Sequence, residues 1–250
     1  MSVLPENCKI AQRITLRTLK LAALGLLIGT TLISGDLMAQ ARDAKPEQPG
    51  KLKPPTMADI GDTTEVAVIK TVKGEIVLEF FPSLAPLHVA NFKKLARSGF
   101  YDGTTFHRVL PGFVIQGGDP NSKDGDPAND GMGGPGYGVK AEFNATPHEK
   151  GILSMARSSD PNSAGSQFFI CLGRASNLDN QYTVFGKVIK GLDVVDAIGA
   201  QKRDPMNPKD RATAAIPMQS VKIIKRAAVV GLEAAKPAAE KKDAAPKKGK

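Results

Sequence analysis

Between residues 64 and 226 the chain contains a series of short extended runs, each bounded by glycine, proline, asparagine or aspartate. Such runs are typical of β-strands joined by tight turns. Seven runs fit this pattern: 65–71, 75–81, 113–116, 152–156, 167–172, 184–189 and 221–224. Only 86–98 and 192–198 have apolar residues at helical spacing. Because an open sheet of this size would expose unpaired edges, we expect a mainly β domain built as a closed antiparallel barrel.

The first 41 residues have the three parts of a secretory signal peptide. A cationic stretch reaches Lys20, an uncharged run of 13 residues covers 21–33, and small residues surround Gln40. The apolar run is shorter than the roughly 20 residues that span a bilayer. We therefore expect export, cleavage after Ala41 and a periplasmic protein with no stable membrane insertion. An uncleaved N-terminal anchor that faces the periplasm is the alternative, because the cationic region is long.

Two further segments lie outside the expected domain, which covers 63–232. Residues 42–62 hold four prolines among charged and polar residues, a composition typical of a spacer. Residues 233–250 are mostly alanine, lysine and proline, and we expect a disordered, solubilising tail. A weak electrostatic contact of this tail with acidic envelope polymers, as in a wall-binding protein, is the alternative.

The composition excludes several classes of function. The net charge is +9, but more than half of the excess lies in 1–41 and 233–250, so we expect no nucleic-acid partner. Two cysteines and three histidines cannot build a cysteine-rich zinc site or a disulfide framework, and no metal or cofactor is expected. Cys8 would leave with the signal peptide, which makes Cys171 a single, buried and inert thiol.

Other catalytic motifs fail on their context. The segment 131–136 has the pattern G-x-G-x-x-G, but it follows Asp130 rather than a strand, and Pro135 interrupts the helix that would bind a pyrophosphate. This segment is expected to be a loop. Ser166 does not lie in G-x-S-x-G, and no carboxylate is spaced to orient His107 as a base. The sequence therefore predicts neither dinucleotide binding nor a nucleophilic triad.

Four blocks carry the informative signal. They are FHRVLPGFVIQGGD at 106–119, HEKGILSMAR at 148–157, GSQFFI at 165–170 and VFGK at 184–187. In their order and spacing, the chain resembles the cyclophilins, the peptidyl-prolyl cis–trans isomerases, over residues 63–226. The resemblance implies an isomerase with a closed eight-stranded antiparallel barrel capped by two α-helices, and together with the predicted signal peptide it leads us to expect a bacterial, exported member.

The resemblance also assigns roles to individual positions. Arg108 matches the family's catalytic arginine. Ten further positions match substrate-binding residues: the proline pocket (Phe113, Val114, Phe169, Leu178), the active face (His107, Gln116), the grip on the peptide backbone (Ala156, Arg157, Gln167), and Tyr182 at the groove. The loop 131–138 would flank this groove.

Three positions depart from the family pattern. Asn177 replaces a tryptophan that is common in relatives that bind cyclosporin tightly, and Tyr182 replaces a common histidine. An indole contributes apolar area and a donor that asparagine lacks, so weak cyclosporin binding is expected. Arg157 stands where some relatives have asparagine, which predicts a different grip on the substrate.

The chemistry of an arginine beside an apolar socket supports the assignment independently. Rotation about an X–Pro bond loses amide resonance, at a barrier of roughly 18–20 kcal/mol, and frees the nitrogen lone pair. A fixed guanidinium can donate to that lone pair better than to the planar imide. A noncatalytic module or chaperone that binds proline-containing segments is the rival hypothesis, but simple binding would not need the arginine. We expect a monomer whose partners are proline-containing segments of unfolded or folding proteins.

Overall fold

A computed structural model describes residues 52–203, 210, 214 and 216–229. The predicted signal peptide, residues 42–51 of the predicted spacer and the predicted tail at 233–250 lie outside the described residues. The described residues all belong to one compact unit.

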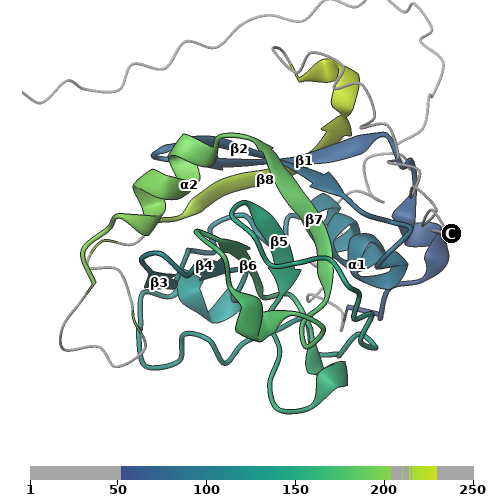
Figure 1. Cartoon of the computed structure of the whole chain (residues 1–250), viewed down its shortest axis with the longest axis horizontal. Helices are drawn as coiled ribbons and strands as arrows, with labels where there is room; N and C mark the ends of the chain where they lie inside the picture. Colours follow the sequence, from purple (N-terminus) through teal and green to yellow (C-terminus); the bar gives the residue numbers. More distant parts are fainter. Residues whose placement is uncertain (1–51, 204–209, 211–213, 215, 230–250) are drawn as a thin grey trace, which may run out of the picture. The chain divides into compact units, whose positions relative to one another are not determined.

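The described part is mainly β (Figure 1). Its strands are β1 (Glu65–Thr71), β2 (Gly74–Phe80), β3 (Arg108–Leu110), β4 (Val114–Gly117), β5 (Ile152–Met155), β6 (Phe168–Cys171), β7 (Val184–Lys190) and β8 (Met218–Lys225). Its α-helices are α1 (Pro86–Arg97) and α2 (Leu192–Gly199). The strand β3 is one that the extended runs did not predict, because three residues before a Pro-Gly turn leave too short a pattern.

The eight strands form one curled antiparallel sheet in the order β3-β4-β6-β5-β7-β2-β1-β8. The expected closed barrel is wrong, because the edge strands β3 and β8 do not pair with each other in this described sheet. Only an isolated bridge between Thr105 and Pro217, just before these strands, links the two edges. Pro217 has no N–H to extend a ladder, and the flanking bonds run from Met218 N to Thr104 O and from Phe106 N to Ile216 O. The sheet is therefore a half-barrel.

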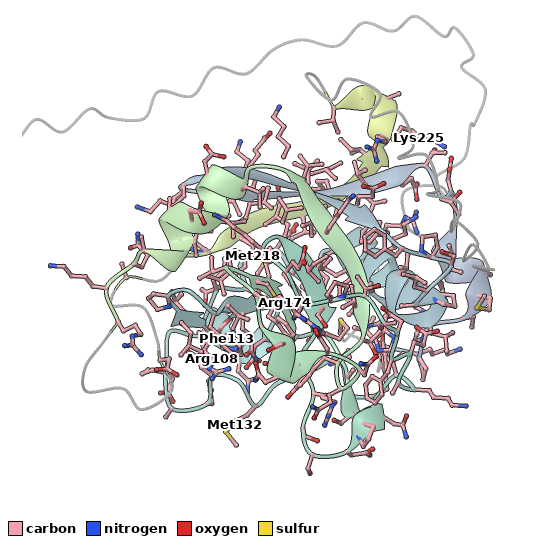
Figure 2. The ribbon with its side chains drawn as sticks, in the orientation of Figure 1. Arg108, Phe113, Met132, Arg174, Met218 and Lys225 are labelled. Carbon is pink, nitrogen blue, oxygen red and sulfur yellow. The ribbon has the colours of Figure 1, made fainter. Side chains whose placement is uncertain are left out.

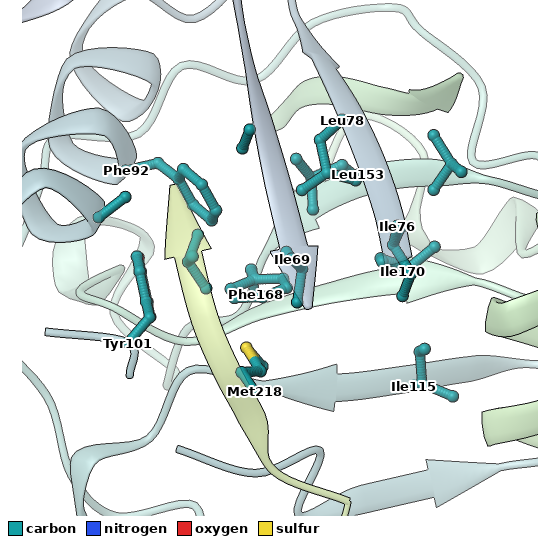
Figure 3. Packing of buried hydrophobic residues seen from close by; sticks show 14 of the residues in the cluster. Ile69, Ile76, Leu78, Phe92, Tyr101, Ile115, Leu153, Phe168, Ile170 and Met218 are labelled. Carbon is teal, nitrogen blue, oxygen red and sulfur yellow. The ribbon is translucent and has the colours of Figure 1, made fainter. Parts of the chain in front are cut away.

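The inner face of the curled sheet holds the main core (Figure 3). Phe92 of α1 lies at its centre, with ring centroids 4.9 Å from Tyr101, 5.4 Å from Phe168 and 5.7 Å from Phe185. All four rings are fully buried. Phe168 therefore belongs to this core, whereas its neighbour Phe169 lies in a second apolar cluster. Because burying one such ring stabilises a fold by about 1.5–3 kcal/mol, this cluster holds α1 against the sheet.

The two α-helices cover opposite ends of the half-barrel (Figure 1). Helix α1 begins at Pro86, whose fixed φ suits a first turn, but Ala85 before it has no side chain to cap the free N–H groups. Glu142, from a distant loop, accepts hydrogen bonds from the N–H of Leu87 and of His88, both at 3.0 Å, and so caps the helix. No helix of the described residues is long and apolar enough to cross a membrane.

The described end of the predicted spacer lies against α1. Residues 57–60 form a 3₁₀ turn that packs on this helix. The Nζ of Lys93, a side chain of α1 that is almost fully buried, donates to Ile60 O at 2.9 Å and to Asp62 O at 2.6 Å, and also contacts Glu65 Oε2 at 3.1 Å. A buried ammonium with three oxygen partners is satisfied, so this contact anchors the entry to β1.

Candidate active site

One row of side chains crosses four neighbouring strands on the outer face of the sheet. Arg108 of β3 pairs with Gln116 of β4, Gln116 pairs with Phe169 of β6, and Phe169 pairs with Ser154 of β5. Side chains alternate between the faces of a strand, so Ile115 points the other way, into the main core. The register therefore brings a cation, an amide and an aromatic ring together from segments far apart in the sequence.

A turn brings Phe113 to this row. Gly112 has φ +75°, a conformation that favours glycine, and Phe113 N donates to Leu110 O at 3.0 Å to close the turn. Phe113 precedes β4, so the alternation of that strand does not decide its direction. Its carbonyl accepts from Leu172 N at 2.8 Å, and its side chain packs with Val114 and Phe169 in a second apolar cluster.

Arg108, Gln116 and Phe169 of this row line one wall of a cleft of about 630 Å³. Ten of the eleven predicted site residues line it: His107, Arg108, Phe113, Val114, Gln116, Ala156, Arg157, Phe169, Leu178 and Tyr182. Figure 2 shows Arg108 and Phe113 close together, with Met132 on the loop beneath them. The eleventh residue, Gln167, lines an adjoining pocket and is hydrogen-bonded to Gln116. The structure thus brings the predicted residues together.

The apolar part of the cleft is a rigid socket. Phe169 is 4% exposed, and its ring lies between the ring of His148, at a centroid distance of 5.9 Å, and that of Tyr182, at 5.8 Å. Val114 and Leu178 are also buried in this cluster. The first contact is stacked and the second is edge-to-face, and a buried ring held by two neighbouring rings cannot move aside, so the socket keeps its shape for an apolar ring.

Behind the socket, three polar residues have the spacing of a hydrolytic triad. His148 Nε2 lies 3.1 Å from Ser154 Oγ, and Nδ1 lies 3.1 Å from Asp179 Oδ1. Ser154 is fully buried, however, and its hydroxyl donates to Thr183 O at 2.9 Å. Burial lowers the pKa of His148, and Asp179 only partly offsets it. No substrate can reach this serine, so the network supports Phe169 and is not a nucleophilic site.

The polar part of the cleft is a chain of amide hydrogen bonds. Arg108 Nη1 makes a long contact of 3.4 Å with Gln116 Oε1. Gln116 Nε2 donates to Gln167 Oε1 at 3.0 Å, and Gln167 Nε2 donates to the carbonyl of Gly133 at 2.8 Å. Because a backbone carbonyl can only accept, it sets the direction of both amides, and the last acceptor in the chain faces Arg108.

Arg108 also lies beside a carboxylate that the sequence did not reveal. Its side chain is 40% exposed, and Nε lies 3.7 Å from Asp210 Oδ2. The other oxygen of Asp210 binds Arg203 Nη1 at 2.9 Å. Asp210 lies outside all four sequence blocks, about 100 residues from Arg108, so only the fold could place it here. Asp130 is a further lining residue that the sequence did not indicate, and Gly131 and Met132 come from the loop 131–138, which was expected to flank the groove.

The glycine-rich segment is a loop, as expected, and it lines the adjoining pocket of about 450 Å³. The carboxylate of Asp119 fixes the loop by accepting from the N–H groups of Gly131 and Gly133. A side chain at position 133 would collide with that carboxylate, which explains the glycine. Within the described residues, no three histidine, cysteine or acidic side chains are grouped so that they could hold a metal ion.

Comparison with known proteins gives a consistent result. The family model described as cyclophilin type peptidyl-prolyl cis-trans isomerase/CLD matches residues 66–225. A probable peptidyl-prolyl cis-trans isomerase of Brucella abortus is 47% identical over 146 residues, which cover 56% of this chain and 74% of the relative. Peptidyl-prolyl cis-trans isomerase B of Bacillus subtilis is 50% identical over 121 residues, covering 48% and 79%.

A solved structure is similar as well. It is the crystal structure of a Cryptosporidium parvum cyclophilin type peptidyl-prolyl cis-trans isomerase in the presence of the dipeptide Ala-Pro. The match has a TM-score of 0.57 and 33% identity, and covers 64% of this chain and 98% of the other.

Proposed function

The chain belongs to the cyclophilin family of peptidyl-prolyl cis–trans isomerases, and from this premise we propose that it accelerates X–Pro rotation in folding proteins of a bacterial cell envelope, with Arg108 as the catalytic residue. One observation carries the assignment of Arg108: its guanidinium stands at the rim of a socket formed by Phe113, Val114, Phe169 and Leu178. The isomerase activity itself follows from the family, whereas the residue roles and the cellular setting are proposals.

The proposed catalysis depends on selective stabilisation of the twisted imide. In the planar ground state the prolyl nitrogen lone pair is delocalised into the carbonyl, and at half rotation it becomes a hydrogen-bond acceptor. Arg108 Nη1 contacts Gln116 and Nε lies near Asp210, whereas Nη2 makes no hydrogen bond to any described residue. These N–H groups can donate to the lone pair as it forms, which lowers the barrier without a covalent intermediate.

The apolar socket holds the prolyl side of the X–Pro bond still while the other side rotates. A pyrrolidine ring that is held between Phe113, Phe169 and Leu178 cannot turn, so the residue before proline must turn instead. The Cryptosporidium parvum relative was solved with Ala-Pro, which supports a proline ligand for this fold. Gln116, Gln167 and Ala156 offer polar groups to the peptide backbone, and His107, Arg157 and Tyr182 complete the cleft.

A refolding experiment separates catalysis from the noncatalytic alternative. The substrate is a denatured protein whose slow phase is prolyl isomerisation, which takes about 10–100 s without a catalyst. We expect the wild type to accelerate this phase at substoichiometric concentration and Arg108→Ala to leave it at its spontaneous rate. If the wild type instead suppresses aggregation without accelerating the phase, the protein is a chaperone or binding module.

The envelope location is proposed from the N-terminal sequence. The cationic stretch, the apolar run and the small residues before Arg42 support export and cleavage. Fractionation of the producing cells, with mass spectrometry of the chain's N-terminus, tests this. A periplasmic chain that begins at Arg42 is the expected result, and a full-length chain in the membrane fraction would establish the anchored alternative.

We also propose a monomer with weak affinity for cyclosporin. Asn177 is exposed in the described structure and precedes Leu178, which lines the cleft, and its side chain supplies no indole there. A titration that gives nanomolar inhibition would contradict the cyclosporin prediction, and light scattering measures the mass.

A further inference from the structure

Arg157 is a cation held in one orientation at the edge of the cleft. It follows β5 by two residues and is half-buried. Its guanidinium carbon lies 4.7 Å from the ring centroid of Tyr182 and 5.7 Å from that of Phe143. Nε donates to Gln181 O at 3.0 Å, and Nη1 donates to Ser158 O at 2.9 Å. Stacking and hydrogen bonding together leave the planar group little freedom.

The third nitrogen of this guanidinium, Nη2, makes no hydrogen bond to any described residue, although Nε and Nη1 both donate to carbonyls. A guanidinium has five N–H donors in a fixed fork, so two of them remain for a ligand. A fixed cation loses little conformational entropy when it binds an anion, which strengthens the binding.

The described side chains that line the adjoining pocket carry a net positive charge. Among the described residues that line it, Arg157 is the only one with a charged side chain. Burial raises the pKa of Tyr137, which also lines it, to about 12, so that phenol is neutral at physiological pH. The nearby carboxylate of Asp119 is engaged with N–H groups of the glycine loop. An acidic side chain entering this pocket therefore meets one net positive charge.

A substrate anchored by its proline can reach this pocket. The main cleft and the adjoining pocket share Gln116, Gly131, Met132, Ala156 and Arg157 in their walls. Each residue of an extended peptide advances about 3.3–3.6 Å, so a residue within a few positions of the proline lies over the pocket. Its side chain is then within reach of Arg157 while the prolyl ring occupies the apolar socket.

We propose that Arg157 gives this isomerase a preference for substrates that carry an aspartate or glutamate within a few residues of the proline, on the side that lies over the adjoining pocket. The inference rests on the proposed use of the cleft. It makes Arg157 a specificity-determining residue that distinguishes acidic from neutral side chains, in addition to any contact with the peptide backbone.

The test compares matched glutamate and glutamine peptides. Each hexapeptide has one proline and one glutamate, which is placed in turn at the two positions before and the two positions after the proline. The control series has glutamine at the same positions. NMR exchange between the cis and trans signals gives kcat/KM without a coupling protease, whose own preferences would interfere. We expect one position at which glutamate is favoured over glutamine by about three- to tenfold at low salt. The ratio should fall with added salt, because the pair is partly exposed.

Variants assign the preference to this side chain. Arg157→Gln should bring the glutamate-to-glutamine ratio to about one, whereas Arg157→Lys should retain part of it. Lys222→Gln removes the same charge from β8, where Lys222 pairs with Asp102, and should leave the ratio unchanged. The ratio is informative because a merely structural arginine would lower the activity on both peptides alike.

Two results would overturn the inference. One is a wild type that is active on the whole series but has no charge preference at any position. The other is a preference that survives in Arg157→Gln. A wild type that is inactive on every peptide would contradict the proposed function instead, so the two failures can be told apart.

Discussion

Gln116→Glu is the most informative change to the polar wall of the cleft, because it alters one atom and adds one charge. The side chain accepts from Arg108 Nη1 at 3.4 Å and donates to Gln167 Oε1 at 3.0 Å. A carboxylate can keep the first contact, as an ion pair, but it cannot make the second. Gln167 cannot compensate by turning its amide, since its oxygen would then face the carbonyl of Gly133, now 2.8 Å from Nε2.

The magnitude follows from the distance and the exposure. Two unit charges at about 4 Å attract each other by about 4 kcal/mol at an effective dielectric constant of about 20, and by about 1 kcal/mol in bulk water. Arg108 is 40% exposed, so an intermediate value of about 2 kcal/mol applies. The new ion pair holds the guanidinium of Arg108 toward the sheet and partly neutralises its charge. The nitrogen of the twisted imide then meets a weaker hydrogen-bond donor. We expect kcat/KM to fall by about 10- to 30-fold.

Gln116→Met is the matched control. It has a similar size and removes the hydrogen bonds without adding a charge, so it should cost about 1 kcal/mol, or about fivefold in kcat/KM. NMR exchange on one proline peptide measures all three proteins, and circular dichroism verifies that each is folded. The reasoning is refuted if the glutamate variant stays within twofold of the wild type, or if the methionine variant is equally impaired.

Two further predictions concern buried groups. Burial raises the pKa of the Cys171 thiol to about 12, so at pH 8 only about one thiol in ten thousand is ionised; iodoacetamide should label it only after denaturation, and peptide mapping that finds rapid labelling of the native protein would contradict this. Burial alone would raise the pKa of Glu142, but hydrogen bonds from His88 and Leu87 outweigh it, so this pKa lies below its usual value. The stabilisation is therefore present above the unfolded-state pKa of about 4.3 and is lost as the pH falls through the folded-state pKa. Glu142→Gln should lower the free energy of unfolding by about 2 kcal/mol at pH 7 and by less at acidic pH, measured by denaturant titration, whereas a loss that is the same at both pH values would contradict this reasoning.

The local pattern was sufficient to predict most elements of the fold. The runs at 65–71 and 184–189 and the helix from Pro86 correspond closely to β1, β7 and α1, because alternation and helical spacing are properties of adjacent residues. The strand β3 was missed because three residues carry no periodicity. The closure of the barrel was predicted wrongly, because it depends on how the segments around Thr105 and Pro217 meet, which is a long-range property.

The candidate site also has residues that the local sequence predicted and residues that only the fold brings into place. Eight of the fourteen described residues that line the main cleft lie in three of the four sequence blocks, 106–119, 148–157 and 165–170, since these blocks contain strands and turns that form its wall. Met132 belongs to the loop 131–138, which the resemblance placed beside the groove, whereas nothing in the sequence indicated that the segment with Asp210 returns to Arg108. The role of Phe143 as a second ring against Arg157 also depends on a loop conformation that no local pattern predicts.

The central claim is that Arg108 binds the twisted imide more strongly than the planar one. The most direct measurement determines kcat/KM and the dissociation constant of the same proline peptide, by NMR exchange and NMR titration, for the wild type and for Arg108→Ala. We predict that kcat/KM falls by about 100-fold or more, whereas the dissociation constant changes by less than about threefold. A dissociation constant that weakens as much as kcat/KM falls, or a variant that remains active, would contradict the account.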